Sequence, residues 1–344
     1  MESIYNYTLE ELEQKFVALE IKKFNAKQVY KWVYEKLCTD FDVMSNLSKA
    51  TIAILKNNFD FNYLQILETY IDPDDETTKF LLETNDKQRI ETVIMKFNYG
   101  YSICISTQVG CNMGCKFCAS GLLKKIRDLS TCEMVLQIIT ANQYLKKHKN
   151  AFISNVVVMG IGEPLDNYEN LKRMLKIINE PFGLKLGSRK VTVSTCGLAN
   201  KILTFAKDFP QTNLAISLHA SNDTIRNKIM PIAAVYNIPK LLHTLHEYSA
   251  IVNRRITIEY LLLKDINDSS DCAMQLASLL KDLNCYVNLI NYNNVSDHNF
   301  TRSTNSEQFA KILIANHINT TTRLERGLKI NASCGQLRAN YEKK

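Results

Sequence analysis

No stretch of this sequence stays apolar for the ~18 residues that a helix needs to cross a bilayer. The first residues, Met1 to Tyr7, provide neither a basic flank nor an apolar core, so no signal peptide is expected. Low-complexity segments, long linkers and short-period repeats are also absent. These absences favour an ordinary globular protein of the cytoplasm with no membrane partner.

The composition is sufficient for a well-packed core. The chain has 344 residues, of which 46% are hydrophobic and 22% charged, enough for one large domain or a large and a small one. Its net charge of +7 and isoelectric point of about 8.7 permit contact with a polyanion. Many globular proteins carry such a surplus, so charge alone does not identify a nucleic-acid partner.

The ten cysteines are the most informative residue class. In a reducing compartment they are not expected to form a disulfide framework, so clusters of them indicate metal binding or catalysis. Five stand singly in helical or strand-like patterns and are interpreted as small buried hydrophobes: Cys38, Cys132, Cys196, Cys272 and Cys285. The other five are candidates for chemistry: Cys104, Cys111, Cys115, Cys118 and Cys334.

Changes in the spacing of hydrophobic residues divide the chain into four parts. Residues 1–57 are expected to form a small helical module. Residues 58–96 contain short antiparallel strands separated by turn residues. Residues 97–328 alternate between strands and helices, and residues 329–344 form a C-terminal segment that carries Cys334.

The alternating region predicts a parallel sheet covered by helices. Six strand–helix units are too few for a closed eight-stranded barrel, so the predicted fold class is α/β with a partial (β/α)6 barrel. Strands are expected at Ser102–Ile105, Asn155–Met159, Lys190–Ser194, Asn213–Ser217, Arg255–Leu262 and Tyr286–Ile290. Helices are expected near 131–148, 167–179, 199–208, 237–250 and 270–283.

The segment from Cys111 to Cys118 is the decisive motif. Three thiolates at C-x3-C-x2-C spacing, on a loop with Gly110 and Gly114, can converge on one point. Structural zinc sites and iron–sulfur clusters normally use four ligands, and no fourth Cys or His lies in this loop. Three ligands leave one iron of a [4Fe–4S] cluster open for a substrate. A zinc-stabilised loop and an iron–sulfur electron carrier remain alternatives.

The spacing, with an aromatic residue before the last Cys, resembles the signature of the radical S-adenosylmethionine (SAM) superfamily. The resemblance implies a [4Fe–4S] cluster ligated by Cys111, Cys115 and Cys118, whose open iron chelates SAM. Several residues lie at or just after the ends of later predicted strands. Each one alone is more often an ordinary strand-end residue. Because they come in order around the carboxyl end of the predicted barrel, they are expected to contact SAM together. They are Gly162, Glu163, Ser194, Ser217, Leu218, His219 and Asn293.

Four further stretches resemble the RlmN/Cfr family of radical SAM RNA adenine methyltransferases. They are Arg89-Ile-Glu-Thr-Val, Cys104-Ile-Ser-Thr-Gln-Val-Gly-Cys, Ser217-Leu-His-Ala-Ser-Asn-Asp with Met230-Pro-Ile, and Ala332-Ser-Cys-Gly-Gln-Leu. The resemblance runs from about Phe24 to Leu337 and implies methylation of an adenine carbon. Pro164 matches the RlmN form, which methylates C2, whereas the Cfr form usually has Ala there and methylates C8.

The family resemblance also implies a division of labour among side chains. Cys334 would take a methyl group from one SAM, in a displacement that needs a thiolate. A second SAM would supply the radical that activates this methyl group. Cys104 would then attack the Cys334 sulfur to release the product, and Glu91 would accept a proton. Without the resemblance, an inert thiol, a core cysteine and a solvated carboxylate are the simpler interpretations.

The family's targets are an adenosine of 23S rRNA at the peptidyl transferase centre and, in some members, adenosine 37 of tRNA. Such a base must leave its stack to be reached. The helical module resembles the family's RNA-binding extension, although a solvated basic helix face is an equal alternative for its candidate contacts: Lys22, Lys23, Lys27, Tyr30, Lys31 and Trp32. The class also implies a flavodoxin- or ferredoxin-type electron donor, and the family a monomer.

Two hypotheses from other functional classes stay open. The first is a non-catalytic iron–sulfur protein that binds RNA and senses redox state, although such a sensor has no need of SAM-binding strand ends. The second is a zinc-stabilised binding module, which would contain zinc and no iron.

Overall fold

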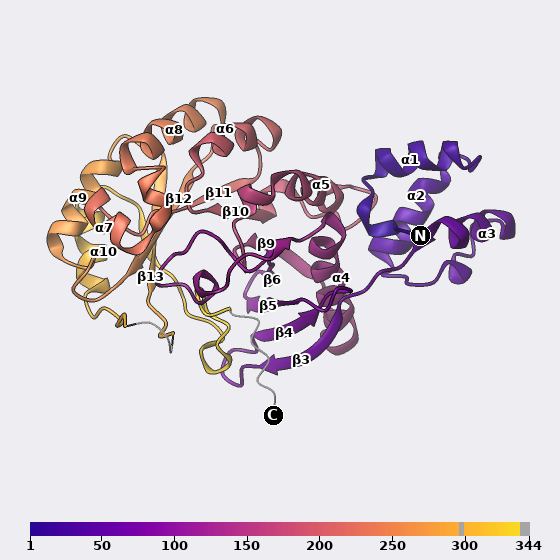
Figure 1. Ribbon diagram of the computed structural model, residues 1–344, viewed down its shortest axis with the longest axis horizontal. Coiled ribbons are helices and arrows are strands. Elements are labelled where there is room, and N and C mark those ends of the chain that lie inside the picture. The colour runs from indigo at the N-terminus through magenta and orange to yellow at the C-terminus, as the bar shows by residue number, and fades with distance from the viewer. Residues whose placement is uncertain (296–298, 338–344) are drawn as a thin grey trace.

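The structure is a computed structural model that describes residues 1–295 and 299–337. The predicted C-terminal segment therefore lies partly outside the described residues, from 338 to 344. Figure 1 shows a helical module at one end of the molecule and a large α/β body beside it. Within the described ranges, no helix is long and apolar enough to span a membrane.

The N-terminal module is built from short helices around an aromatic core. Its α-helices are α1 (Leu9–Ala18), α2 (Asn25–Tyr30) and α3 (Lys49–Asn58), and β1 (Glu2–Ser3) pairs in parallel with β2 (Phe59–Asp60). The start of α1 is fixed by a capping box between Thr8 and Glu11. The module docks on the body through polar contacts, including a 3.0 Å hydrogen bond between the Ser3 hydroxyl and the Cys132 thiol.

One sheet of ten strands forms the centre of the described part of the body, in the order β14-β13-β12-β11-β10-β9-β6-β5-β4-β3. Its antiparallel part comprises β3 (Gln65–Ile71), β4 (Thr78–Glu83) and β5 (Arg89–Phe97). Its parallel part comprises β6 (Gly100–Cys104), β9 (Ile153–Val158), β10 (Val191–Thr195), β11 (Asn213–Ser217), β12 (Ile256–Leu262), β13 (Cys285–Asn291) and β14 (Thr320–Thr322). The predicted partial barrel is thus confirmed, and β14 extends it by one strand.

Helices cover the outside of the parallel strands, as Figure 1 shows. The five predicted helices are present as α4 (Thr131–Lys149), α5 (Tyr168–Asn179), α6 (Ala199–Asp208), α8 (Ile238–Ile251) and α9 (Ser270–Leu280). Two more were not predicted, α7 (Asp223–Ile229) and α10 (Ser306–Ala315). Because the helices lie outside, the inward side chains of the strands and the loops at their carboxyl ends are left to build a site.

The single cysteines behave as interpreted. Cys132, Cys196, Cys272 and Cys285 are buried, and Cys38 is half-buried with its thiol donating to the Asp40 carbonyl. Burial raises the pKa of Cys132 to about 12 and that of Cys285 to about 11, so both are neutral thiols at pH 7.

Candidate active site

The three-cysteine loop lies between β7 (Gln108–Val109) and β8 (Arg127–Asp128), at the carboxyl end of the barrel. Cys111, Cys115 and Cys118 are half-buried and line one cavity of about 160 Å³. The loop folds back tightly where Gly110 has φ of +77°, and a Cβ there would lie 2.3 Å from the Lys124 carbonyl oxygen. Only glycine fits this approach.

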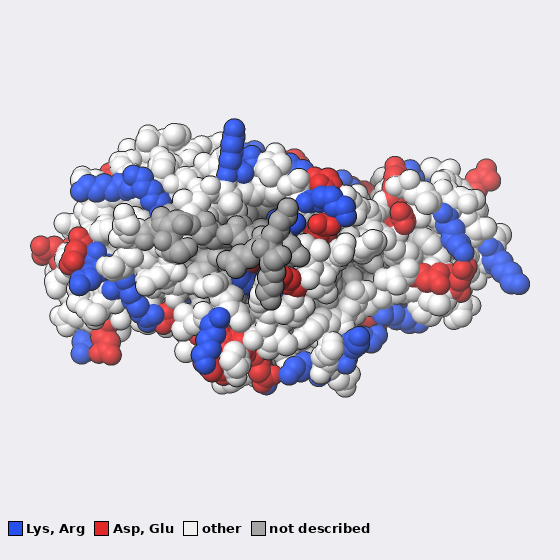
Figure 2. All heavy atoms as spheres, turned by 60° about the horizontal axis from the view of Figure 1, so that its bottom comes forward, with Lys and Arg blue, Asp and Glu red and all other residues white. Residues whose placement is uncertain are grey.

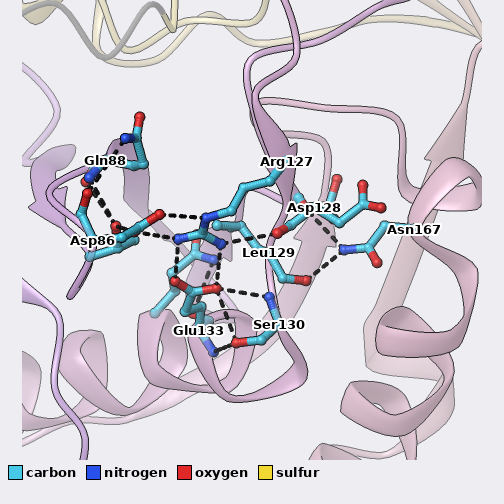
Figure 3. Close-up of polar contacts among 11 residues, drawn as sticks. Asp86, Gln88, Arg127, Asp128, Leu129, Ser130, Glu133 and Asn167 are labelled. Carbon is cyan, nitrogen blue, oxygen red and sulfur yellow. Dashed lines mark hydrogen bonds and ion pairs between the residues drawn. The ribbon is translucent and has the colours of Figure 1, made fainter.

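An ion-pair network anchors the chain that follows the loop. Figure 3 shows Arg127 between Asp86 of the β4–β5 turn and Glu133 of α4. Its guanidinium donates to each carboxylate at 2.6–2.9 Å. Lys125 pairs with Asp166 at 2.7 Å, and Asp166 follows the Gly-Glu-Pro segment after β9. These contacts tie the three-cysteine loop to its neighbours before any cofactor binds.

Three thiols on one short loop are a donor set that fits an iron–sulfur cluster. No three His, Cys, Asp or Glu side chains in residues 1–295 and 299–337 are grouped to hold one metal ion. Zinc needs its ligands about 2.0–2.3 Å from one centre, whereas a cluster spreads its thiolates over several irons. Burial raises the pKa of Cys111 to about 12 and the pKa values of Cys115 and Cys118 as well. A bound cation would stabilise the thiolates that burial disfavours.

Gly162 and Glu163 lie in the loop after β9 and line the same cavity. The Glu163 carboxylate accepts hydrogen bonds from the backbone amides of Leu165 at 3.1 Å and Cys196 at 2.8 Å. It therefore joins the carboxyl ends of β9 and β10. Burial raises the pKa of Glu163, although these hydrogen bonds act in the opposite direction.

We expect Gly162→Ala to weaken SAM binding, because Gly162 has φ of +108° and a Cβ there would lie 2.6–2.8 Å from Gln108 and Thr107 side-chain atoms. Backbone strain of about 1–3 kcal/mol corresponds to a roughly 5- to 150-fold loss of affinity. Equilibrium dialysis of SAM on cluster-loaded protein measures it. Gly187→Ala is the matched control, since its Cβ would meet no atom within 4 Å. Equal affinities would contradict the expectation.

Three of the predicted SAM contacts face the same cavity from β10 and β11. The hydroxyls of Ser194 and Ser217 are 3.5 Å apart, and His219 lines the cavity beyond them. His219 Nδ1 accepts from the Leu261 amide at 3.0 Å, and burial lowers the pKa of His219 to about 3. The imidazole is therefore neutral at pH 7. Leu218 differs, because its side chain packs in the hydrophobic core.

A second cavity of about 320 Å³ adjoins the first, and Asn293 lines it. Asn293 is buried, and its amide oxygen has no hydrogen-bond partner in the part of the chain that the structure describes. An unsatisfied buried oxygen is costly, so it indicates a place for a donor on a ligand. Cys118 and Cys334 line both cavities, and Cys104 lines only the second.

Cys334 accepts a hydrogen bond from Arg323, a residue that the sequence did not predict to be part of the site. Nη1 of Arg323 donates to its sulfur at 3.0 Å, and the thiol raises the pKa of Arg323. This hydrogen bond holds the sulfur in place at the wall of both cavities. Arg323 follows β14 and also lies near the buried Glu259, which accepts from Asn288 at 2.9 Å.

Cys104 and Glu91 lie on the same face of neighbouring strands. Cys104 pairs in register with Val93, two residues beyond Glu91 on β5. Burial, and then the nearby Cys334, raise the pKa of Cys104 to about 12. Glu91 is buried and pairs with Lys79 at 2.9 Å, outside the residues that line the two cavities.

Arg226 is a second residue of the site that the sequence did not predict. Arg226 is fully buried and donates to the carbonyl oxygens of Leu218, Tyr236 and Cys196 at 2.7–3.2 Å. It therefore joins the ends of β10 and β11, from which His219 and Cys196 reach the cavity. Nothing in the sequence around Arg226 marks it as buried, since it lies on a seven-residue helix.

Only some of the residues that were predicted to contact RNA in the helical module are exposed. Tyr30 is 1% exposed, so the prediction that it offers a stacking surface is wrong. Lys27 lies over the Phe182 ring of the body at 4.7 Å, and Lys36 lies over Trp32 at 3.2 Å. Figure 2 shows basic and acidic side chains intermixed on the displayed face rather than one basic patch.

Comparisons with known proteins identify the family of the chain. Residues 3–60 match the family described as ribosomal RNA large subunit methyltransferase N-terminal domain, and residues 105–276 match the radical SAM superfamily. A protein of Malacoplasma penetrans named probable dual-specificity RNA methyltransferase RlmN is 50% identical, over 98% of this chain and 96% of its own. A Spiroplasma citri protein of the same name is 47% identical, over 99% of both chains.

A solved structure agrees as well. A radical SAM methyltransferase from Sphaerobacter thermophilus is 39% identical and superposes with a TM-score of 0.94, over 99% of this chain and 100% of its own. Radical SAM membership implies a [4Fe–4S] cluster and SAM as cofactors. The chain therefore belongs to the RlmN family of radical SAM RNA methyltransferases.

Proposed function

We propose that this enzyme transfers a methyl group to C2 of an adenosine, with Cys334 as the methyl carrier. The observation that carries the proposal is the position of Cys334, which lines both adjoining cavities. One cavity contains the three cluster cysteines and the other contains Cys104. A carrier between two chambers can receive a methyl group from one and present it to a base in the other.

The proposed ligands of the cluster are Cys111, Cys115 and Cys118. SAM is proposed to contact Gly162, Glu163, Ser194, Ser217, His219, Asn293 and the backbone of Leu218. SAM would supply both the methyl group and the radical chemistry that activates it, so two molecules would be consumed per methylation.

Cys334 and Cys104 have different proposed tasks because their surroundings differ. The Cys334 sulfur accepts a hydrogen bond from Arg323 and acts as the nucleophile toward the SAM methyl group. Cys104 has a pKa of about 12 and stays a neutral thiol until the adduct forms. It then attacks the Cys334 sulfur, so that an S–S bond forms and the S–C bond breaks. The released carbon takes the electron pair and a proton.

Glu91 is the proposed proton acceptor for the hydrogen on the adenine carbon. Lys79 pairs with Glu91 and also donates to the Asn331 carbonyl at 3.2 Å, three residues before Cys334. Through Lys79, Glu91 is thus linked to the segment that carries Cys334. A base must be within hydrogen-bond reach of its proton in the complex, although geometry without substrate is often looser.

Arg323→Gln is expected to slow methylation of Cys334 by about 10- to 150-fold, the equivalent of one charge-assisted hydrogen bond. The measurement is the rate at which the Cys334 peptide gains a methyl group from SAM without RNA, followed by mass spectrometry. Arg323→Lys retains the charge and should lose less. An unchanged rate in Arg323→Gln would remove Arg323 from the proposal.

The RNA substrate is proposed to be the adenosine of 23S rRNA at the peptidyl transferase centre, with adenosine 37 of tRNA as a second target. The names of the relatives, which describe dual specificity, support two substrates. A flavodoxin- or ferredoxin-type donor would supply electrons to a cytoplasmic monomer. The test is methylation of both RNAs in vitro, followed by fragmentation of the modified nucleoside. C2-methyladenosine supports the proposal, and C8-methyladenosine or unmodified RNA would overturn it.

A further inference from the structure

A stacked aromatic pair lies at the second cavity, away from the three-cysteine loop. The rings of Phe97 and Tyr99 are nearly parallel, at 6° and 5.0 Å between centroids, and both line the cavity. Tyr99 is 60% exposed and stands in the turn between β5 and β6. Gly100 fixes this turn, since it has φ of +124° and its Cβ would lie 2.8 Å from Ser154 Oγ.

Arg326 adds an available cation to the aromatic pair. Its guanidinium carbon lies 5.2 Å from the centroid of the Phe97 ring, and Arg326 lines the same cavity. Its Nε is buried without a hydrogen-bond partner among the described residues. A carboxylate near Arg326 is that of Asp75, whose pKa is lowered in part by Arg326. The two oxygens of Asp75 accept hydrogen bonds from the backbone amides of Thr77 and Gly327.

The Arg326 backbone is joined to the methyl carrier. Its carbonyl accepts a 2.6 Å hydrogen bond from Ser333 Oγ, directly before Cys334. This hydrogen bond joins one member of the platform formed by Phe97, Tyr99 and Arg326 to the residue before Cys334. The buried Arg326 Nε, which has no partner among the described residues, is a donor that a ligand would satisfy.

We propose that this platform stacks the nucleobase next to the target adenosine and that Arg326 contacts the phosphate between the two nucleotides. The inference rests on the proposed function, because it takes the second cavity as the chamber for the reacting base. A base that is extruded from its stack leaves a neighbour with an uncovered face. Aromatic rings and Arg guanidinium groups bind such faces regardless of sequence, and Arg is also suited to phosphate.

RNA fits this surface better than a protein electron donor does. The three side chains offer flat faces and one guanidinium that forms no salt bridge within residues 1–295 and 299–337, which are the features that a single-stranded polyanion with aromatic bases requires. A protein partner would need a larger contact area than one aromatic pair and one cation. Reductant docking is therefore an alternative that the experiment must distinguish.

The test compares Tyr99→Ala with Tyr63→Ala. Tyr63 is 68% exposed and lines neither of the two cavities, so it is a matched control. The probe is an RNA stem-loop with an unpaired adenosine and 2-aminopurine on its 5′ or 3′ side. Tyr99→Ala should weaken RNA binding about 5- to 150-fold, the range for one lost stacked base, and should abolish the quenching of 2-aminopurine. Tyr99→Trp should restore both.

Methylation of Cys334 by SAM, measured without RNA, separates this inference from the proposed function. It should be unchanged in Tyr99→Ala, with kcat/KM for RNA reduced mainly through KM. RNA affinity and quenching equal to those of wild type or of Tyr63→Ala would overturn the platform. Slower turnover at unchanged RNA affinity, with the Cys104–Cys334 disulfide accumulating, would overturn it in favour of reductant docking. If wild type itself leaves Cys334 unmethylated, the proposed function fails, and the binding and quenching results still decide on the platform.

Discussion

Replacing Cys334 with alanine is expected to reduce RNA methylation by at least about 10³-fold, because the variant loses the atom that carries the methyl group. Iron and sulfide content should remain that of wild type, since Cys334 is not a proposed cluster ligand. The measurement combines methyl transfer to RNA from labelled SAM with analysis of iron and sulfide.

The control for Cys334→Ala is Cys38→Ala. Both cysteines are half-buried, but Cys38 lies in the N-terminal module and lines neither cavity. Its activity should match wild type. Methylation that persists in Cys334→Ala within tenfold of wild type would show that the methyl group reaches the base by a route without this sulfur.

Cys104→Ala should convert a catalytic intermediate into an end product. Without the attacking thiol, the bond between the Cys334 sulfur and the transferred carbon cannot be resolved, so protein stays covalently attached to RNA. We expect at most one turnover and an RNA–protein band that survives denaturing electrophoresis. Digestion of this band should yield the Cys334 peptide linked to a modified adenosine.

Two further variants make the Cys104 experiment specific. Cys285→Ala removes another buried thiol that lines neither cavity and should leave turnover unchanged. A Cys104→Ala/Cys334→Ala double variant should form no covalent band. Multiple turnovers with free methylated RNA from Cys104→Ala would remove Cys104 from the mechanism.

Local patterns in the sequence were sufficient to predict most of the fold. Short apolar runs between helical segments predict β9 to β13, and β12 is buried along its whole length. The C-x3-C-x2-C loop was also predictable, since its three cysteines lie within eight residues. The strand β14 was missed because its three Thr residues form no apolar run, and the seven-residue α7 is too short to show a helical period.

Contacts that depend on the assembled barrel could not be predicted in this way. Arg323 reaches Cys334 only because β14 joins the sheet beside β13. The burial of Tyr30 follows from the packing of α2 within the module, which a Lys-rich sequence did not reveal. The Lys79–Glu91 pair likewise requires the register of β4 against β5. Each case joins residues through a tertiary surface rather than through local spacing.

We propose that Cys334 carries the methyl group beside a cluster held by Cys111, Cys115 and Cys118. The most direct measurement is mass spectrometry of the Cys334 peptide from anaerobically purified enzyme, together with iron and sulfide analysis of the same sample. We predict the mass of one added methyl group on Cys334, and iron and sulfide in the ratio of a [4Fe–4S] cluster. Zinc in place of iron, with Cys334 unmodified after incubation with SAM, would show that the three cysteines hold no iron–sulfur cluster and that Cys334 carries no methyl group.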